Sequence, residues 1–423
     1  MSRNEMSVPH SVQEVVHTCA VRAKHGSAAL ARASDAEIDT ALRAMAERLH
    51  TARGTLTAAN QDDLRSAASS GMSHALQDRL RLTGPRLADM ATELRTLADV
   101  PHEPRDSVLE ERPDGLVLLE RRRPVGVIGA NFEARPNVTL DVTSQLLKSR
   151  NGGVLRTGSA ALRSSQALIT HVIAPALTDA GLDPDAIQLV PSEDRAAAYA
   201  LVSLPETVPL VILRGSGEST RELGHAAARH GVRTLAHADG GGVLYVGRDA
   251  DEKMVLELVS NSLDRLGVCN RLNLLLIDRA VYEGLLPGIL KTLKDLGITA
   301  SLPPHTHARG YEWSLDSEHA ATVTIDAADG PLEAARIANE ETSGLAAAVI
   351  TQDPDDAAQF MDAYGGSGVF WNSTTRLLDG FKLLHLPETG INIDRVPGPR
   401  GPVTYRDLHL RQYVVRPATS IRS

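Results

Sequence analysis

Apolar segments of strand length alternate with helical segments through most of this chain, and this alternation constrains the fold more than any other feature. The segment PVGVIGA at 124–130 is apolar throughout, as strands buried on both faces of a parallel sheet are. Helices are predicted at 138–149, 160–180, 193–203 and 217–230, and they separate the later apolar segments GGVLRT, IQLV, LVILRG, RTLAHA and VLYVGR. The pattern predicts a doubly wound α/β sheet.

A second α/β block follows a predicted helix at 251–266. Its strands are expected in NLLLID, TVTID, AAVITQ and GVFWNS, and its helices at 280–296, 330–341 and 354–363. The first 100 residues indicate amphipathic helices instead, one of them starting at a capping box formed by Ser34 and Glu37. A late segment, LRQYVVRP, has the composition of a strand.

Composition narrows the class of protein. The chain has 423 residues, enough for two or three domains, and a formal net charge of −9, which argues against a nucleic-acid or anionic-membrane binder. Two cysteines cannot form a disulfide framework. No apolar segment reaches the roughly 20 residues that span a bilayer, and the N-terminus lacks the apolar stretch of a signal peptide. We expect a cytoplasmic enzyme.

Cys269 is the first candidate for chemistry. It lies in SLDRLGVCNRLN, between a predicted helix and a predicted strand, where the two α/β blocks join. Clefts form at such junctions, which favours a nucleophile. Free cysteine is also among the most buried residue types, so a packing role stays open from the residues alone.

Three segments place polar residues after an apolar strand and before a helix. In VIGANFEARPNVTL these residues are Glu133, Arg135 and Asn137, at the edge of the sheet where open α/β folds bind ligands. GGVLRTGSAAL and VILRGSGEST supply Arg156, Gly158, Arg214, Gly215 and Ser216. Backbone N–H groups at helix starts attract phosphate, although tight turns and helix capping explain the same glycines and the nearby Pro136.

Several motifs together resemble the aldehyde dehydrogenase superfamily and, within it, most closely the γ-glutamyl phosphate reductases, also called glutamate-5-semialdehyde dehydrogenases. The matching segments are RRPVGVIGANFEARPNVTLDV, NGGVLRTGSAA, HADGGGVLYV, GVCN and WNSTTRLLDG. The resemblance covers roughly residues 15–415. It departs from the reductases at 241–243, at Asn273, in 343–353 and in 383–388, which suggests a divergent paralogue whose acyl substrate need not be γ-glutamyl phosphate.

The resemblance implies a domain organisation. An NAD(P)-binding domain would span 13–249, with 108–123 contributing to a small β extension used in oligomerisation. A catalytic domain holding Cys269 would span 250–375, and 376–423 would return to the cofactor site and supply the second oligomerisation segment. A homodimer or homotetramer is expected, because exposed strand edges otherwise invite aggregation.

The resemblance also implies roles for individual residues. Cys269 falls on the catalytic thiol, and Asn137 on the asparagine whose amide forms an oxyanion hole with the N–H of the cysteine. Arg156 falls where a basic residue meets the adenosine ribose or its phosphate, and Glu388 on the glutamate that holds the nicotinamide ribose. His237 replaces the glutamate that activates water in hydrolytic relatives, and either a packing or a proton-transfer role suits it.

The expected activity is therefore NAD(P)H-dependent reduction of an amino-acid acyl phosphate to the aldehyde through a cysteine thioester, with an amino-acid kinase as a possible upstream partner. NADPH is expected rather than NADH, since Arg156, with Arg214 and Ser216, suits a 2′-phosphate. The residues expected to touch the substrate are Glu133, Arg135, Asn270, Arg271 and Arg376. An oxidative aldehyde dehydrogenase and a catalytically silent nucleotide-binding homologue are the alternatives. No metal is expected.

Overall fold

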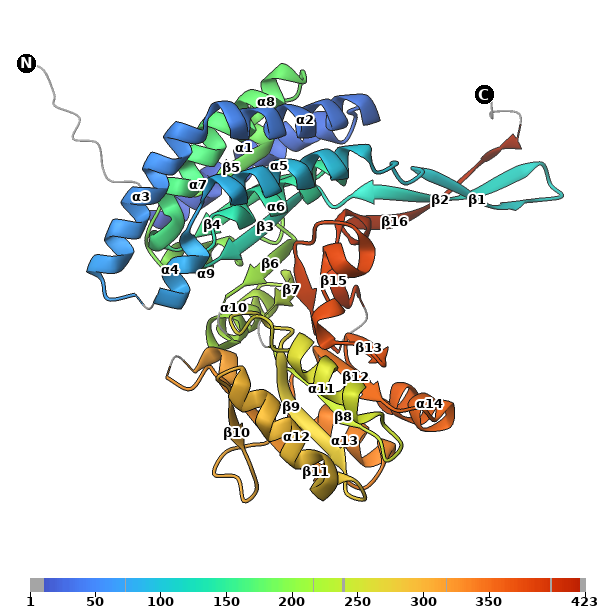
Figure 1. The fold of residues 1–423 in the computed structure, drawn as a ribbon. Coiled ribbons are helices and arrows are strands. Elements are labelled where there is room, and N and C mark those ends of the chain that lie inside the picture. The colour runs from blue at the N-terminus through green and yellow to red at the C-terminus, as the bar shows by residue number, and fades with distance from the viewer. Residues whose placement is uncertain are drawn as a thin grey trace, which may run out of the picture. The chain divides into compact units, whose positions relative to one another are not determined.

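The structure, a computed structural model, describes residues 11–418 except Ser73, Ser216, Ala238, Asp239, Ser317, Val396 and Pro397 (Figure 1). The chain forms two compact units. The first unit reaches Leu235 and also takes in Leu386–Gly390 and the chain from Thr404 onward. The second unit comprises Ala236–His385 and Ile391–Val403.

The first unit is built on a five-stranded sheet in the order β5-β4-β3-β6-β7. Strand β3 pairs in parallel with β4 on one side and β6 on the other, which is the doubly wound arrangement that the alternation predicts. The strands are β3 (Val127–Phe132), β4 (Gly152–Thr157), β5 (Ile187–Leu189), β6 (Leu210–Arg214) and β7 (Arg233–His237).

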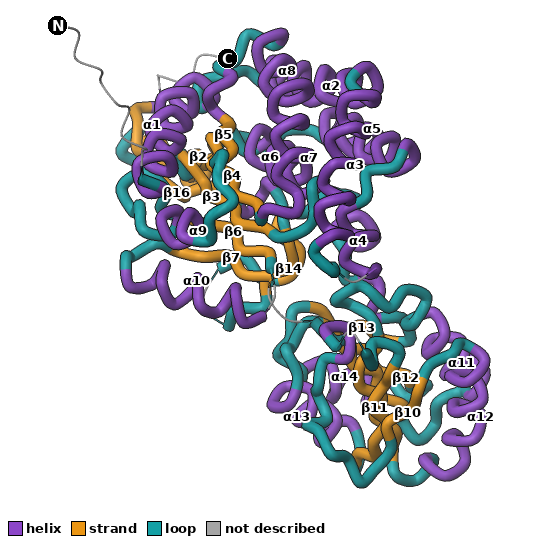
Figure 2. Tube along the Cα trace, turned by 90° about the vertical axis from the view of Figure 1, so that its left-hand side faces the viewer, coloured by secondary structure: helices purple, strands orange, loops and turns teal. Residues whose placement is uncertain are grey.

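Helices cover both faces of this sheet (Figure 2). Side chains of α1, α9 and α10 pack with β3, β4 and β6 in one apolar core. The helices of this unit are α1 (Val12–Leu30), α2 (Asp35–Thr51), α3 (Arg53–Ser69), α4 (His74–Leu80), α5 (Gly84–Asp99), α6 (Asn137–Lys148), α7 (Leu162–Leu168), α8 (Ala174–Asp179), α9 (Ala196–Leu201) and α10 (Gly217–Arg229). The helix predicted at 160–180 is divided, because a π-helical turn at Ile169–Ile173 separates α7 from α8.

Helix α2 shows how local sequence sets these elements. Ser34 accepts a hydrogen bond from the N–H of Glu37, and the Glu37 carboxylate accepts one from the N–H of Ser34, so the predicted capping box starts the helix. Ile38, Leu42 and Met45 follow at helical spacing, and all three are fully buried.

A three-stranded antiparallel sheet in the order β1-β2-β16 projects from the first unit (Figure 1). It consists of β1 (Asp106–Glu111), β2 (Leu116–Pro124) and β16 (His409–Pro417). The late segment LRQYVVRP is thus a strand, and it pairs with the segment predicted at 108–123. Val108, Leu410 and Tyr413 are each more than half exposed on this sheet.

The second unit holds a six-stranded sheet in the order β10-β11-β9-β8-β12-β13. Helices α11 and α12 lie on one face and α13 and α14 on the other (Figure 2), each pair over its own apolar core. The elements are β8 (Gly242–Val246), α11 (Glu252–Asn261), β9 (Leu272–Asp278), α12 (Tyr282–Asp295), β10 (Thr299–Ser301), β11 (Thr322–Ala328), α13 (Pro331–Glu341), β12 (Ala346–Ile350), α14 (Pro354–Ala363) and β13 (Gly368–Trp371). Two short strands, β14 (Gly390–Asn392) and β15 (Gly401–Val403), pair separately.

One strand differs from its predicted place. The segment VLYVGR was assigned to the first sheet, but β8 pairs in parallel with β9 and β12 in the second sheet. The first compact unit therefore gives way to the second at 235/236, whereas the sequence placed this boundary at 249/250. An apolar strand buried on both faces has no pattern that specifies its neighbours, which explains the error.

None of the described helices is both long enough and apolar enough to cross a membrane. Among the described residues, no group of three or more histidine, cysteine, aspartate or glutamate side chains is arranged to hold a metal ion.

Candidate active site

Asn137 is the first residue of α6, directly after the loop that leaves β3. Ala134 in this loop has φ of 47°, a left-handed conformation that non-glycine residues rarely adopt. The side-chain amide of Asn137 donates a hydrogen bond to Asp141 Oδ2 at 2.8 Å. The two residues are one helical turn apart, so the helix itself fixes the direction of the amide.

Asp141 is a site residue that the sequence analysis missed. Burial raises the pKa of its carboxyl to about 6, and the positive charges of Arg214 and Arg135 oppose this rise. An aspartate four residues after a helix-opening asparagine is a signal available in the sequence. Arg135 is a half-buried residue of the loop between β3 and α6. Its positive charge acts on Asp141, so the two side chains lie near each other in the first unit.

A cavity of about 420 Å³ opens at the carboxyl ends of β3 and β4. Its walls include Arg156 and Gly158 from the end of β4, Ser159, and residues of α9 and α10. Two of the predicted cofactor residues, Arg156 and Gly158, are therefore together. The strand order reverses at β3, and α/β sheets bind ligands at such a switch point.

Arg156 lies at the back of this cavity, with only 5% of its surface exposed. Nη1 donates to Asn131 Oδ1 and Nη2 to the carbonyl of Asp194, each at 3.2 Å. Its buried Nε has no hydrogen-bond partner among the described residues. A buried guanidinium that keeps a donor unsatisfied fits a phosphate or hydroxyl oxygen of a bound dinucleotide.

Glu133 also lines this cavity. Its Oε1 accepts a hydrogen bond from Ser219 Oγ in the first turn of α10 at 3.1 Å, and its carboxylate lies against the α-carbon of Gly215. Glu133 contributes a favourable charge interaction with Arg156. The structure therefore moves Glu133 from the predicted substrate set to the cavity of Arg156.

Arg214 and Gly215 are outside the lining of this cavity, and the positive charge of Arg214 acts on the half-buried Asp141. The second guanidinium in the cavity comes from Arg195, which the sequence analysis did not single out and which pairs with Glu222 at 2.6 Å. Ser216 lies outside the described residues.

Cys269 is half-buried in the second unit and packs against a small apolar cluster that includes Leu345 and Leu378. The chain passes very close to it at Gly240, where a β-carbon would lie 2.6 to 2.7 Å from the Cys269 backbone and side chain. The N–H of Gly241 donates to the Cys269 carbonyl at 2.6 Å. Only glycine fits at 240, so the Gly-Gly-Gly segment holds the cysteine loop.

Asn270, directly after the cysteine, braces the same loop. Its amide donates to the carbonyl of Leu378 at 3.0 Å, and its side-chain oxygen accepts from the guanidinium of Arg376. Arg376 is only 8% exposed and also donates to Asp264 at 2.7 Å. Both residues were predicted to touch substrate, and the structure gives their polar atoms protein partners instead.

Arg271 is fully buried, so the prediction that it touches substrate is wrong. Its guanidinium donates to the carbonyls of Ala320 and Thr322 at the start of β11. Burial lowers the pKa of the Arg271 guanidinium to about 10.

His237 ends β7, and its Nδ1 accepts the backbone N–H of Ile391 at 2.7 Å. In the neutral ring the proton is then on Nε2, which makes that nitrogen a donor rather than a base. Both residues of this contact belong to the second compact unit, although β7 itself is a strand of the first sheet.

Glu388 belongs to the short segment Leu386–Gly390 that returns to the first unit. The preceding Pro387 lines a small hollow together with Leu140 and Asp141 of α6. The segment Leu386–Gly390 thus runs beside the first turns of α6, the helix that begins at Asn137.

Comparison with known proteins identifies the family. The model of the aldehyde dehydrogenase family matches residues 2–308. The chain belongs to the aldehyde dehydrogenase family. It is 36% identical over 429 residues to a γ-glutamyl phosphate reductase of Opitutus terrae, across 97% of this chain and 99% of that protein. Family membership confirms the predicted superfamily and its α/β fold.

Solved structures of aldehyde dehydrogenase relatives agree with this. The γ-glutamyl phosphate reductase of Thermotoga maritima superposes with a TM-score of 0.86 at 27% identity, over 96% of this chain and all of that one. An acetylating aldehyde dehydrogenase of Geobacillus thermoglucosidasius shares the fold, with a TM-score of 0.69 at 14% identity over 97% and 98% of the two chains.

Proposed function

We propose that this aldehyde dehydrogenase family member is an oxidoreductase that reduces an acyl phosphate to the aldehyde with NAD(P)H. The substrate is γ-glutamyl phosphate or a related amino-acid acyl phosphate. The observation that carries this proposal is the 36% identity to a γ-glutamyl phosphate reductase across 97% of the chain. The glycine-braced loop of Cys269 supports it.

The covalent step belongs to Cys269. Its thiolate attacks the acyl carbon, the acyl–phosphate bond breaks, and phosphate leaves with the electron pair, so a thioester forms on Sγ. The amide of Asn137, directed by Asp141, and the N–H of Cys269 would stabilise the oxyanion, and each such donor is typically worth about 3 kcal/mol. Gly240 and Asn270 fix the loop that presents the thiol.

NAD(P)H supplies a hydride when bound. In this chain Arg156 and Arg195 would hold its phosphates, and Gly158 would let it approach the backbone, since all three line one cavity. Glu388, in the segment that returns to the first unit, would hold a ribose. The unsatisfied Nε of Arg156 is the observation that supports this assignment. It suits either cofactor, and NADPH is the one we propose because a guanidinium matches phosphate oxygens.

His237 supports the direction of the reaction. With Nδ1 occupied by the N–H of Ile391, the neutral ring offers water no base, so the thioester would escape hydrolysis. An oxidative aldehyde dehydrogenase that releases free acid needs such a base.

The test is to incubate the purified protein with NADPH and synthetic γ-glutamyl phosphate, and to follow NADPH absorbance and aldehyde. Turnover is expected in the wild type and in Cys19→Ala, whereas Cys269→Ala should lose turnover and retain NADPH binding. Rapid acid formation from the aldehyde and NADP⁺ in phosphate-free buffer would instead establish the oxidative function. Binding of NADPH without turnover of any acyl phosphate would favour the silent homologue.

The proposal also covers the oligomeric state, the upstream enzyme and the cellular location of this protein. We propose a cytoplasmic homodimer or homotetramer that receives its unstable acyl phosphate from an amino-acid kinase. The exposed apolar side chains of the β1-β2-β16 sheet support an oligomer.

A further inference from the structure

The first unit holds a second large cavity, of about 430 Å³, which no part of the proposed reaction uses. Pro124 and Arg150, just before β3 and β4, lie in its wall, so it opens at the amino ends of these strands. The cavity of Arg156 opens at their carboxyl ends. The two cavities therefore lie at opposite edges of one sheet, and a dinucleotide in the cavity of Arg156 does not fill this one.

Positive charge dominates the wall of this cavity. Two carboxylates, those of Asp35 and Glu103, line it, against six cationic side chains on a protein whose net charge is −9. The cations are Arg105, Arg122, Arg123, Lys148, Arg150 and Arg406.

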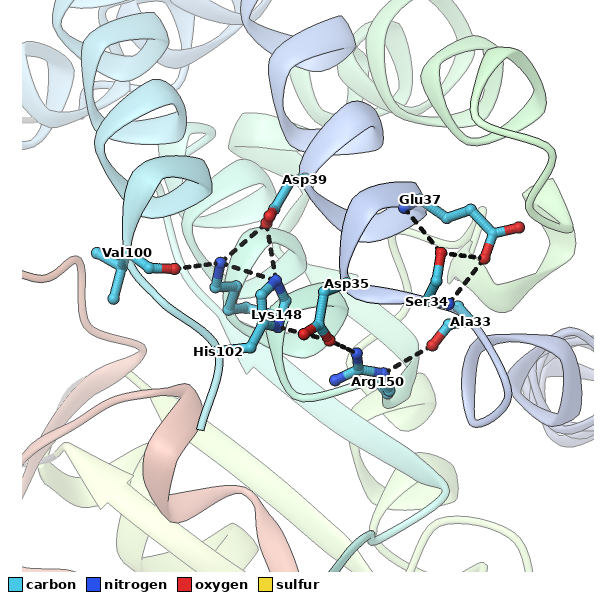
Figure 3. Close-up of polar contacts among 9 residues, drawn as sticks. All are labelled: Ala33, Ser34, Asp35, Glu37, Asp39, Val100, His102, Lys148 and Arg150. Carbon is cyan, nitrogen blue, oxygen red and sulfur yellow. Dashed lines mark hydrogen bonds and ion pairs between the residues drawn. The ribbon is translucent and has the colours of Figure 1, made fainter. Parts of the chain in front are cut away.

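Part of this charge serves the structure (Figure 3). Lys148 has a fully buried side chain; its Nζ donates to Asp39 at 2.9 Å and to the Val100 carbonyl at 2.8 Å, and lies 3.0 Å from His102 Nε2. These contacts use all three ammonium protons, so Lys148 is a brace beneath the cavity. Arg150 is paired with Asp35.

The remaining cations exceed the carboxylates that face them. Glu103 is shared, since Arg406 reaches it at 2.8 Å and Arg122 at 3.4 Å. Arg105 and Arg123 form no ion pair with the described residues, although both line the cavity. With Asp39 and with Asp106, which acts on Arg105 but is already paired with Arg121, the six cations face four carboxylates.

Tyr405 gives a second, independent indication. It lines the cavity with only 4% of its surface exposed, and its hydroxyl proton has no acceptor among the described residues, because the neighbouring Arg406 guanidinium can only donate. Burying a hydroxyl proton without an acceptor is unfavourable, and a bound anion would supply that acceptor.

We propose that this cavity binds a small phosphate-bearing anion with more than one negative charge. Guanidinium groups match phosphate oxygens in bidentate geometry, and Arg105 and Arg123 are the groups with donors to offer. Tyr405 would donate from the wall, while Lys148 and His102 keep its floor rigid.

The probe is pyrophosphate, titrated calorimetrically at low ionic strength into protein saturated with NADPH, so that the cofactor cavity is filled. The double variant Arg105→Ala/Arg123→Ala should weaken binding at least about tenfold, the effect of losing one or two charge-assisted hydrogen bonds. Tyr405→Phe should weaken it less. Arg229→Ala, at the exposed end of α10, is the matched control and should bind as the wild type does.

Three outcomes would overturn the proposal. The first is equal pyrophosphate binding by the double variant and the wild type. The second is citrate binding as tightly as pyrophosphate with the same sensitivity to the variants, which would assign the cavity to polycarboxylates. The third is a fall in molar mass of the double variant without anion binding by the wild type, which would mean that an acidic segment of a second copy fills the cavity.

Discussion

At the scale of single residues, Asp141 makes the stability of this protein depend on pH. The pKa of its carboxyl is about 6 in the folded chain and near 3.8 in an ordinary setting, so the folded state holds this proton more tightly than the unfolded state. Ionisation between pH 4 and pH 7 therefore lowers the free energy of unfolding, by up to about 3 kcal/mol.

Asp141→Asn should remove this dependence, because the amide oxygen still accepts from Asn137 and carries no charge. Urea unfolding of both proteins at intervals from pH 4 to pH 7 measures it. As the pH rises, the free energy of unfolding of the variant should increase relative to that of the wild type. A constant difference over this range would mean that Asp141 titrates normally.

Glu133 should tune cofactor choice. Its carboxylate faces the cavity of Arg156, where it repels the 2′-phosphate of NADPH more than the hydroxyl of NADH. Glu133→Gln should tighten NADPH about three- to tenfold and leave NADH nearly unchanged, as measured by fluorescence titration. Arg156→Ala should weaken the binding of NADPH more than that of NADH. Glu206→Gln, on an exposed loop, is the control, and equal effects on both cofactors would refute the role of Glu133.

At the scale of elements, the cysteine loop depends on a close approach at Gly240. A methyl group there would lie 2.7 Å from the β-carbon of Cys269, so Gly240→Ala must displace the thiol. Turnover should fall at least about tenfold, since small displacements of a reacting group are costly.

Gly54→Ala is the matched control, because no atom lies within 4 Å of the added carbon and the residue is in α3. It should keep full activity and gain about 0.5–1 kcal/mol in stability. Wild-type turnover by Gly240→Ala would show that the loop yields without moving Sγ.

Elements were the level at which the sequence predicted best. The helix expected at 217–230 is observed at Gly217–Arg229, since amphipathic periodicity and terminal glycines are local signals. Sheet membership is not local, which is why β8 was assigned to the wrong sheet.

Side-chain direction was predicted least well. Motifs in the sequence were enough to select Asn137, Arg156 and Cys269 as candidate site residues. The hydrophobic periodicity, however, does not tell whether the side chain of an arginine faces a ligand or a carbonyl group. Arg271 follows Cys269 by two positions and is nevertheless buried against the start of β11. Asp141 went unnoticed, because its importance comes from its surroundings in the fold and its contact with Asn137.

At the scale of the whole molecule, the β1-β2-β16 sheet should hold the oligomer together. Tyr413 and Val415 point to the same face of β16, and both are more than half exposed. Tyr413→Asp/Val415→Asp should lower the molar mass measured by light scattering without unfolding the protein. Gln412→Asp, on the opposite face, should not. An unchanged mass in the double variant would place the interface elsewhere.

The position of β16 in the chain has a consequence for synthesis. Strand β2 is the middle strand of its sheet, yet its partner β16 begins only at His409, so a nascent chain carries an unpaired β2 edge until that strand is made. At ordinary elongation rates this edge waits roughly 15–60 s for its partner. Unpaired edges recruit other strands, and charged side chains discourage this. We therefore expect the run Glu120-Arg121-Arg122-Arg123 at the end of β2 to discourage wrong pairing of this edge while the chain is unfinished.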